Sequence, residues 1–417
     1  MKKNTIANFI GQIYSIIIGL IMLPFYLKHL GSESYGLIGF FTMLQYWIAM
    51  LDLGLSGTLA REAARLNNKL RELQNIIKSI ELFYYMMGAV IVTIIYFFSE
   101  WIVTKWLNIE ELRLSTVVIS IQLMGLMIAI KLNISLYRGI IIGFENQVWL
   151  NIYNIIFNSF RFIGAFLIIY FITTDILYFF LYQTVVVLVE YIVIVQKVKG
   201  YFSKFGDAIY SFNSLKNIIH FALSLGISTM LWIAFSQFDK LFLSHLVTLT
   251  EYGYYSLVIV IISALMNLVA PIGQAVLPRM VALYANNNIE KMFDLYYILT
   301  KIISILMFSV VGIISYYAFE LLFVWTGNHE AAQWGAPILR WYAIGSAFAS
   351  LIQLLYFLQY AHGNLKYHLR FHLIIPFIGI STMYFVLTTY GPIAIGFFWF
   401  TYNILIFIFW SYFIHKK

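Results

Sequence analysis

Hydrophobic residues gather in twelve long runs that are separated by short polar connections. The runs lie near residues 5–27, 35–58, 79–98, 114–136, 148–171, 176–196, 218–238, 254–276, 296–319, 336–359, 371–389 and 392–413. Each run is close to the ~20 residues that an α-helix needs to cross the hydrocarbon core of a bilayer. The connections contain Gly, Pro and Asn, which interrupt helices. The pattern predicts an all-α, polytopic membrane protein with twelve transmembrane helices.

The longest connection on the expected cytoplasmic side lies midway along the chain, at residues 197–217. We expect it to join an N-terminal six-helix lobe, 1–196, to a C-terminal six-helix lobe, 218–417. The Lys and aromatic residues of this linker are typical of an amphipathic segment on the membrane surface, and equally of a solvated loop. Residues 60–78 have the same two interpretations.

Part of the N-terminal half recurs in weaker form in the C-terminal half. The recurring residues are Glu33, Arg61, Asn68 and Glu72, which correspond to Glu251, Arg279, Asn286 and Glu290. Two related halves in one chain are a common plan among membrane transporters.

Composition supports the membrane assignment. Only 11% of the residues are charged and 62% are hydrophobic, whereas about 25% of the residues of a soluble domain are charged. The chain has no cysteine, which excludes a disulfide framework and a thiolate metal site. The net charge of +8 is interpreted as positive cytoplasmic loops rather than as a nucleic-acid surface.

Lys and Arg set the expected orientation. Most of the 26 Lys and Arg residues lie in the connections that share a side with the N-terminus, and acidic residues are frequent in the connections of the other side. The positive-inside rule therefore predicts that both termini are cytoplasmic. The first run follows Lys2 and Lys3, is longer than a signal-peptide core and lacks a small-residue cleavage site, so we expect it to be a retained helix.

Polar residues recur at helical spacing within six of the apolar runs. They are Asn4, Asn8, Gln12, Ser15 and Gly19 in the first run; Gln45, Asp52 and Ser56 in the second; Asn151, Asn154, Asn158 and Arg161 in the fifth; Asn217, His220, Ser224 and Ser228 in the seventh; Ser263, Asn267, Pro271 and Gln274 in the eighth; and Arg340, Ala343, Ala347 and Ser350 in the tenth. Residues at such spacing share one helix face. Such a stripe either lines a water-filled cavity or joins helices by hydrogen bonds. Six stripes in both halves favour a cavity between two lobes.

Arg161 lies near the middle of its run, where a cation costs at least ~2.5 kcal/mol to insert. It shares a helix face with Asn151, Asn154 and Asn158. We therefore expect its guanidinium to face water, an anionic ligand, or Glu190 on the next helix at similar depth.

Three acids lie within apolar runs: Asp52, Glu190 and Asp239. An acid at membrane depth is a candidate functional residue, and these three are candidates to carry a coupling proton or sodium ion. The alternative is an ion pair with a nearby cation, such as Arg161 for Glu190 or Lys240 for Asp239.

Other charged and ligating residues have structural interpretations. Lys131, Arg138 and Arg279 are placed toward cytoplasmic helix ends, where a long cationic side chain reaches the lipid phosphates. His368 and His372 have the i, i+4 spacing of a metal pair, but no acid or third ligand is near, which favours an interfacial helix face. No nucleotide-binding loop, serine elbow or HExxH motif is present, so the sequence indicates no enzyme, ATP-driven pump, metal or cofactor.

The stretch NFIGQIYSIIIGLIMLPFYLKHLGSESYGLIGFF, followed by LDLGLSGTLAREAAR, resembles the O-antigen flippases. These form part of the polysaccharide-transporter branch of the multidrug/oligosaccharidyl-lipid/polysaccharide exporter superfamily. QFDKLFLSHLVTLTEYGYYSL and APIGQAVLPRM in the second half also fit. The resemblance implies a twelve-helix, two-lobed, V-shaped transporter of the bacterial inner membrane.

The resemblance also implies a substrate and its contacts. The expected substrate is an undecaprenyl-pyrophosphate-linked sugar repeat unit, exported to the periplasmic face. Cationic cavity residues of the family are thought to contact the pyrophosphate or acidic sugars, and the matching positions here are Arg161, Arg340 and Lys240. The expected cavity residues are Arg161, Asn151, Asn154, Asn158, Asn8, Gln12, Arg340 and Lys240. Membrane lipid, a coupling ion and other polysaccharide assembly proteins are the further expected partners.

Two other functions stay open from sequence. A drug or cation exporter of the same superfamily would use buried acids such as Asp52, Glu190 and Asp239, although Arg161 and the N-terminal pattern argue against it. A membrane polymerase of the same pathway would need a large outer loop, and the longest outer connections, near 99–113 and 320–335, are short.

Overall fold

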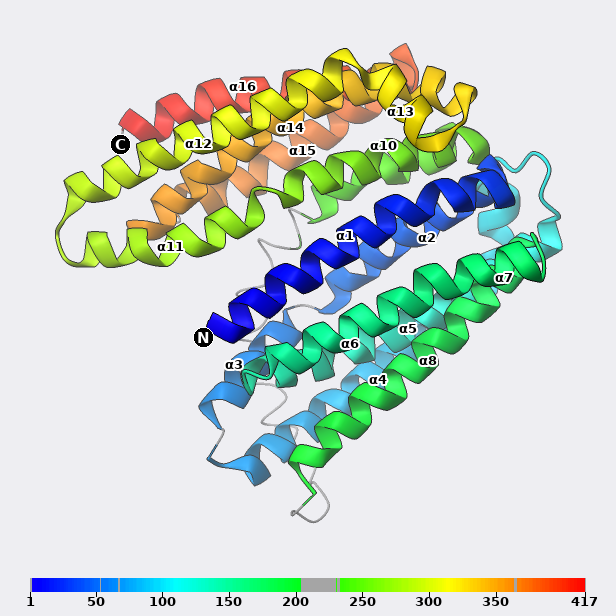
Figure 1. Cartoon of the computed structure of the whole chain (residues 1–417), viewed down its shortest axis with the longest axis horizontal. Helices are drawn as coiled ribbons and strands as arrows, with labels where there is room; N and C mark the ends of the chain where they lie inside the picture. The colour runs from blue at the N-terminus through cyan, green and yellow to red at the C-terminus, as the bar shows by residue number, and fades with distance from the viewer. Residues whose placement is uncertain are drawn as a thin grey trace. The chain divides into compact units, whose positions relative to one another are not determined.

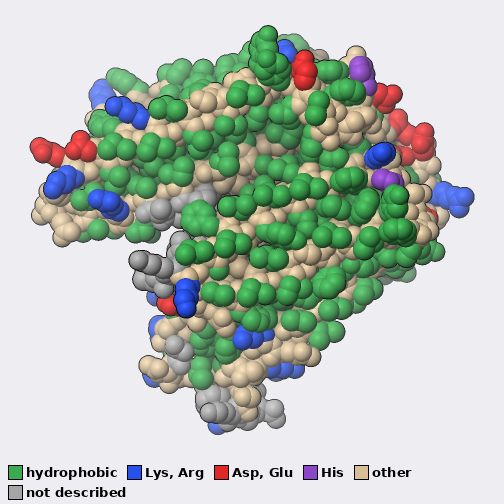
Figure 2. Space-filling model, viewed as in Figure 1, with side chains coloured by type: hydrophobic (Ala, Val, Ile, Leu, Met, Phe, Trp, Pro, Cys, Tyr) green, Lys and Arg blue, Asp and Glu red, His purple; other side chains and the backbone are tan. Residues whose placement is uncertain are grey.

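The computed structural model describes residues 2–52, 54–66, 68–203, 230, 233–363 and 366–416. These residues are almost entirely helical, as the sequence predicts (Figure 1). The chain divides into two compact units, Met1–Lys240 and Leu241–Lys417. Within each, hydrophobic side chains cover the middle of the visible face, and charged side chains gather toward the helix ends (Figure 2).

The first unit contains the helices α1 to α8, together with short 3₁₀ and π segments. In chain order they are α1 (Lys2–Leu30), α2 (Ser32–Ala49), the 3₁₀ turn η1 (Met50–Asp52), α3 (Leu55–Arg65), α4 (Leu70–Trp101), the π-helix η2 (Ile102–Trp106), α5 (Leu114–Gly143), α6 (Gln147–Ser159), the π-helix η3 (Phe160–Gly164), α7 (Ala165–Phe171) and α8 (Ile176–Tyr201). Residues 233–246 are also helical, and the unit boundary falls within them.

The second unit continues with seven α-helices in its described part. They are α10 (Leu249–Asn267), α11 (Ala270–Ala285), α12 (Ile289–Tyr316), α13 (Ala318–Thr326), α14 (His329–Ala361), α15 (Lys366–Tyr390) and α16 (Ala394–Lys416). The long helix α14 packs against α10, α11, α12, α13 and α16 and forms the centre of this unit.

Ten helices in the described part of the chain are long and apolar enough to cross a membrane. The prediction of an all-α, multi-pass membrane protein is therefore confirmed. The predicted seventh run, 218–238, and the linker 197–217 fall largely outside the described residues. The eleventh run lies in α15, whose apolar stretch Ile374–Tyr390 is shorter than a full span. The number twelve stays a prediction.

The predicted second run, 35–58, is not one continuous helix. Helix α2 ends in η1, and Gly54 then adopts a left-handed backbone with φ of 76°, a conformation that suits glycine because it lacks a Cβ. Helix α3 starts afresh at Leu55. Asp52 consequently lies in the turn between two helices, instead of on the face of a long spanning helix.

Helix α5 is the packing centre of the first unit, in contact with α3, α4 and α8. Two glycines make the approach of α3 possible. A Cβ at Gly139 would collide with the backbone carbonyl oxygen of Ser56, and one at Gly143 would collide with that of Ala60. Small residues four apart allow such close helix contact in membranes. This contact fixes Ser56 beside α5.

The recurring residues occupy equivalent places in the two units. Each pair lies at the same point in the order of helices. Glu33 and Glu251 lie in the first turns of α2 and α10, and Arg61 and Arg279 lie within α3 and α11. Asn68 and Asn286 lie in the turns that follow α3 and α11, and Glu72 and Glu290 lie in the first turns of α4 and α12. The helix order therefore agrees with the two-halves pattern of the sequence.

Candidate functional site

Asp52 is held by four hydrogen bonds from uncharged groups. Its Oδ2 accepts from the backbone N–H and the hydroxyl of Ser56, at 3.3 and 2.8 Å, and its Oδ1 accepts from the hydroxyls of Tyr84 and Ser135, the latter at 3.1 Å. The donors come from α3, α4 and α5. Because η1 places the carboxylate between these helices, all three can reach it.

A cavity of about 450 Å³ opens beside this carboxylate within the first unit. Its lining comes from α2, η1, α3 and α5 and includes Thr42, Gln45, Tyr46, Asp52, Ser56, Lys131 and Ser135. The cavity therefore combines one cation, one acid, an amide and several hydroxyls. Ile48, Ala49, Ile128 and Leu132 make the rest of the lining apolar, so the few polar groups would orient a ligand that enters the cavity.

Lys131 does not extend to lipid phosphate as the sequence suggested. Its ammonium donates to Oε1 of Gln45 and lies 5.4 Å from the centre of the Phe41 ring. No ion pair within 4.0 Å joins it to an acid in the described part of the chain. The prediction was wrong because α5 runs on to Gly143, which places Lys131 well within the helix instead of at its end.

Arg138 also points into the unit. Its guanidinium donates to Oδ1 of Asn154 on α6 at 2.6 Å, so the predicted snorkelling role is wrong for the same reason. Arg138 and Arg161 lie close enough to Lys131 for the three positive charges to repel one another. Three cations therefore gather on α5 and the neighbouring η3.

Arg161 forms an ion pair with Glu190 of α8. The side chain of Glu190 is 2% exposed and that of Arg161 is 19% exposed. Of the environments predicted for Arg161, the structure therefore realises the ion pair. Glu190 has a cation partner, which was the alternative to its role as an ion carrier.

The backbone around Arg161 forms the π-helix η3. A π turn leaves α-helical carbonyl groups without their usual partners, and such turns are frequent at functional sites. Here side chains supply the donors: Tyr26 donates to the carbonyl oxygen of Phe162 at 2.7 Å, and Gln183 donates to that of Arg161 at 2.9 Å. Helices α1 and α8 thus fix the position of Arg161.

The polar stripes of the first and fifth runs meet each other. Asn151 of α6 donates to Asn8 of α1 at 2.5 Å, and Asn158 donates to Ser15 at 2.8 Å. Interhelical hydrogen bonding, the alternative to a cavity, accounts for these contacts. Gln12 and Asn8 are exposed on the described part of the unit. Their predicted contact with substrate stays a prediction.

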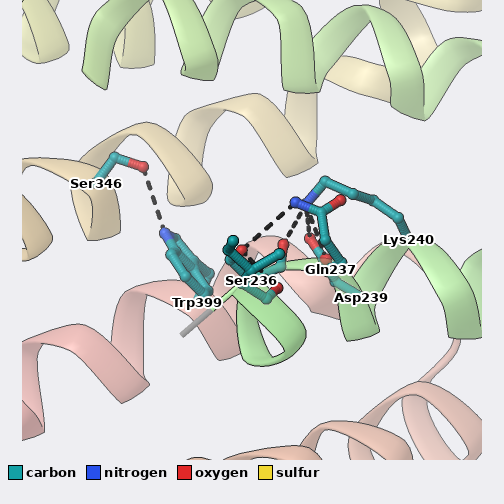
Figure 3. A network of polar contacts seen from close by, with 7 residues as sticks. Ser236, Gln237, Asp239, Lys240, Ser346 and Trp399 are labelled. Carbon is teal, nitrogen blue, oxygen red and sulfur yellow. Dashed lines mark hydrogen bonds and ion pairs between the residues drawn. The ribbon is translucent and has the colours of Figure 1, made fainter. Parts of the chain in front are cut away.

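Asp239 and Lys240 form an ion pair with each other, as Figure 3 shows. The ammonium of Lys240 lies 2.9 and 3.0 Å from the two carboxylate oxygens and donates to the carbonyl oxygen of Ser236 at 2.7 Å.

In the second unit, Arg340 is exposed, and its Nε donates to the carbonyl oxygen of Ser315 at 3.2 Å.

Several predicted positions lie outside the described residues or side chains. They are Asn217, His220, Ser224 and Ser228 of the seventh run, and the side chains of Pro271, Gln274 and His372. Conversely, the hydrogen-bonding roles of Tyr84 and Ser135 at Asp52 were missed. Ser135 lies in the long apolar helix α5. A single serine in such a helix gives no sequence signal that it contacts an acid far away in the chain.

Comparison with known proteins identifies the family of this chain. Residues 1–284 match the family model described as polysaccharide biosynthesis protein. The chain belongs to that family. A curated relative, the "Putative O-antigen transporter" of Shigella flexneri, is 23% identical over 405 residues, which is 95% of this chain and 93% of the relative. The resemblance inferred from sequence is thereby confirmed.

Solved structures share the fold. An inward-facing multidrug resistance MATE family transporter of the MOP superfamily matches with a TM-score of 0.79 at 14% identity, over 96% of this chain and 95% of its own. The lipid II flippase MurJ, in an inward closed conformation, matches with a TM-score of 0.74 at 14% identity, over 100% and 88%. A MOP superfamily transporter from Pyrococcus furiosus matches with a TM-score of 0.65 at 15% identity, over 99% and 95%. The chain therefore has the fold of the MOP superfamily.

Proposed function

We propose that this protein is a flippase, and not an enzyme, that moves an undecaprenyl-pyrophosphate-linked oligosaccharide, the O-antigen repeat unit, across the bacterial inner membrane. The movement runs from the cytoplasmic to the periplasmic face by alternating access of the two halves. The charged and hydroxylated headgroup cannot cross hydrocarbon unaided, because it would lose its hydration. The family and the MOP fold support this proposal.

The observation that carries the proposal is the pair of cations Lys131 and Arg138. Each donates to the oxygen of a neutral amide, Gln45 or Asn154, and neither has an acid within ion-pair distance in the described residues. Their charges are therefore available to an anion. A pyrophosphate is an anion of matching charge, and both Lys and Arg are common phosphate ligands in proteins.

Sugar hydroxyls need both donors and acceptors, which the amide and hydroxyl side chains of the first unit supply. We keep as proposed substrate contacts all the residues predicted from sequence and add the two cations of α5. The full set is Asn8, Gln12, Lys131, Arg138, Asn151, Asn154, Asn158, Arg161, Lys240 and Arg340.

Asp52 is the first candidate for a coupling proton or sodium ion. Glu190 and Asp239 each have a cation partner, whereas Asp52 accepts hydrogen bonds from hydroxyl and backbone N–H groups of the described residues. Protonation of Asp52 would therefore remove a negative charge that has no ion-pair partner among the described residues. Its position on the wall of the cavity would connect that change to the occupant.

We propose that both termini and the linker 197–217 face the cytoplasm, because Lys and Arg predominate there. The lobes 1–196 and 218–417 are the proposed moving halves. Contact with other polysaccharide assembly proteins is part of the same proposal, since the exported unit must pass to a polymerising enzyme.

The test is complementation of a strain that lacks this gene. The intact gene should restore surface polysaccharide, and the double variant Lys131→Gln/Arg138→Gln should fail to do so while lipid-linked repeat units accumulate. Lys105→Gln, which changes an exposed cation on η2, is the matched control and should complement. Normal surface polysaccharide with the double variant at parental abundance in the membrane would overturn the assignment of the cations.

A further inference from the structure

A second polar cluster lies between α4, α5 and α8 of the first unit, and none of its residues lines the Asp52 cavity. Glu81 of α4 accepts a hydrogen bond at its Oε1 from the hydroxyl of Tyr137 on α5, at 2.8 Å. Tyr85 of α4 and Tyr191 of α8 share a hydrogen bond of 2.7 Å between their hydroxyls. The rings of Tyr137 and Tyr191 lie 6.0 Å apart. Three helices thus contribute to one cluster.

Two charges of this cluster have no opposite charge within the described residues. Among the described residues, Oε2 of Glu81 takes part in no hydrogen bond or ion pair. Lys78 lies three residues earlier on α4, and its ammonium likewise has no hydrogen bond or ion pair among the described residues. Lys78 is exposed and Glu81 is half-buried. A cation and an acid on one helix face, both accessible, match a ligand that carries one charge of each sign.

The position of Glu81 along α4 places it at the edge of the hydrocarbon. No charged residue occurs between Glu81 and Glu100, and the helix rises about 28 Å between them at ~1.5 Å per residue. The hydrocarbon core is about 30 Å thick. Glu81 and Glu100 therefore mark the two boundaries of the bilayer on α4, and Lys78 and Glu81 lie at the level of the lipid headgroups.

The surface beyond the cluster is suited to hydrocarbon chains. Large hydrophobic side chains are exposed along both flanking helices from the tyrosines toward the other boundary: Leu82, Met86, Val90 and Ile94 on α4, and Val185, Leu188 and Ile192 on α8. Helices α4 and α8 both pack on α5. A lipid whose chains cover this surface has its headgroup beside Glu81 and Lys78.

We propose that this cluster binds a phospholipid with a primary amine headgroup, an ethanolamine phospholipid. The ammonium donates to Oε2 of Glu81, and the phosphate accepts from Lys78. Tyr85 is 45% exposed, and its hydroxyl offers a further hydrogen bond to the headgroup. Charge complementarity selects a zwitterion over an anionic glycerol headgroup, since the latter brings no cation to Glu81. A choline headgroup carries the cation but has no N–H to donate.

Native mass spectrometry of the full chain in detergent tests the proposal. The protein is titrated separately with dioleoyl phosphatidylethanolamine, phosphatidylcholine and phosphatidylglycerol. We expect the ethanolamine lipid to bind about fivefold more tightly than the choline lipid, the effect of one hydrogen bond from the ammonium to the carboxylate of Glu81. Glu81→Gln should abolish that preference, because the amide oxygen keeps the bond from Tyr137 while an NH₂ group, which cannot accept from an ammonium, replaces Oε2. Lys78→Gln should weaken all three lipids alike.

Glu100→Gln is the matched control, since it changes an exposed acid at the other boundary of the same helix; it should keep the preference. Far-UV circular dichroism of each variant should be that of the parent. Equal affinity of the parent for the ethanolamine and choline lipids, a preference for the glycerol lipid, or an unchanged preference in Glu81→Gln would overturn the site. Unchanged affinities in Lys78→Gln would overturn its contact with phosphate.

Discussion

The Arg161–Glu190 ion pair gives the sharpest prediction about the first unit. Arg161→Gln leaves the carboxylate of Glu190, 2% exposed, without its cation. Removing one partner of a buried ion pair costs about 3–5 kcal/mol, because the remaining charge stays desolvated. Glu190→Gln should cost less, about 1–3 kcal/mol, since Arg161 is 19% exposed and is reached more readily by water.

The double variant Arg161→Gln/Glu190→Gln removes both charges together. The donors from Tyr26 and Gln183 to the backbone of η3 remain, so the local backbone is still held. We therefore expect the double variant to be more stable than the sum of the single losses predicts, with a coupling free energy of about 2 kcal/mol. Unfolding in mixed detergent micelles, followed by tryptophan fluorescence, measures the three free energies of unfolding.

The same variants separate a structural role of Arg161 from a role in transport. If Arg161 contacts substrate, the double variant should be folded but should restore no surface polysaccharide. A coupling free energy of zero would refute the energetic reasoning, and full complementation by the stable double variant would refute a contact between Arg161 and substrate.

Three further predictions follow from the structure and the sequence. Asp52→Asn should slow transport and flatten its dependence on an imposed pH gradient in proteoliposomes; an equal response of variant and parent would exclude Asp52 as the proton carrier. Gly139→Leu should lower the yield of folded protein, because its side chain would meet the carbonyl of Ser56, while Gly312→Leu, with open space around it, should not; equal yields of folded protein would show that α3 moves away at little cost. Reporter fusions after Lys291 should give a cytoplasmic signal and fusions near Glu110 a periplasmic one, and the reverse pattern would overturn the orientation.

The sequence predicted the helices well because hydrocarbon imposes a strong demand on composition. Each apolar run that the structure describes contains a helix, since every backbone group in lipid must bond within its own segment. The predicted positions of the helix ends were less accurate. Helix α4 begins at Leu70 rather than near residue 79, because helices continue past the hydrocarbon into polar sequence, where apolar runs give no signal.

The details of the candidate site depended on features that a hydropathy pattern does not contain. The break at Asp52 follows from the backbone of Gly54, and a single glycine in an apolar run does not reveal whether it bends the chain. The contact of Arg138 with Asn154 depends on how α5 and α6 are rotated about their axes. Stripes on α1 and α6 showed which faces are polar, but not that these faces meet.

The central claim, transport of a lipid-linked oligosaccharide, is tested most directly by reconstitution. Proteoliposomes would contain the purified full chain and an undecaprenyl-pyrophosphate-linked oligosaccharide initially present in one leaflet. An impermeant enzyme that modifies the sugar would report the fraction that has crossed to the other leaflet. We predict faster crossing than in protein-free vesicles, and protein-free rates with Lys131→Gln/Arg138→Gln. Crossing at the protein-free rate with the folded parent protein, under every imposed ion gradient, would contradict the proposed function.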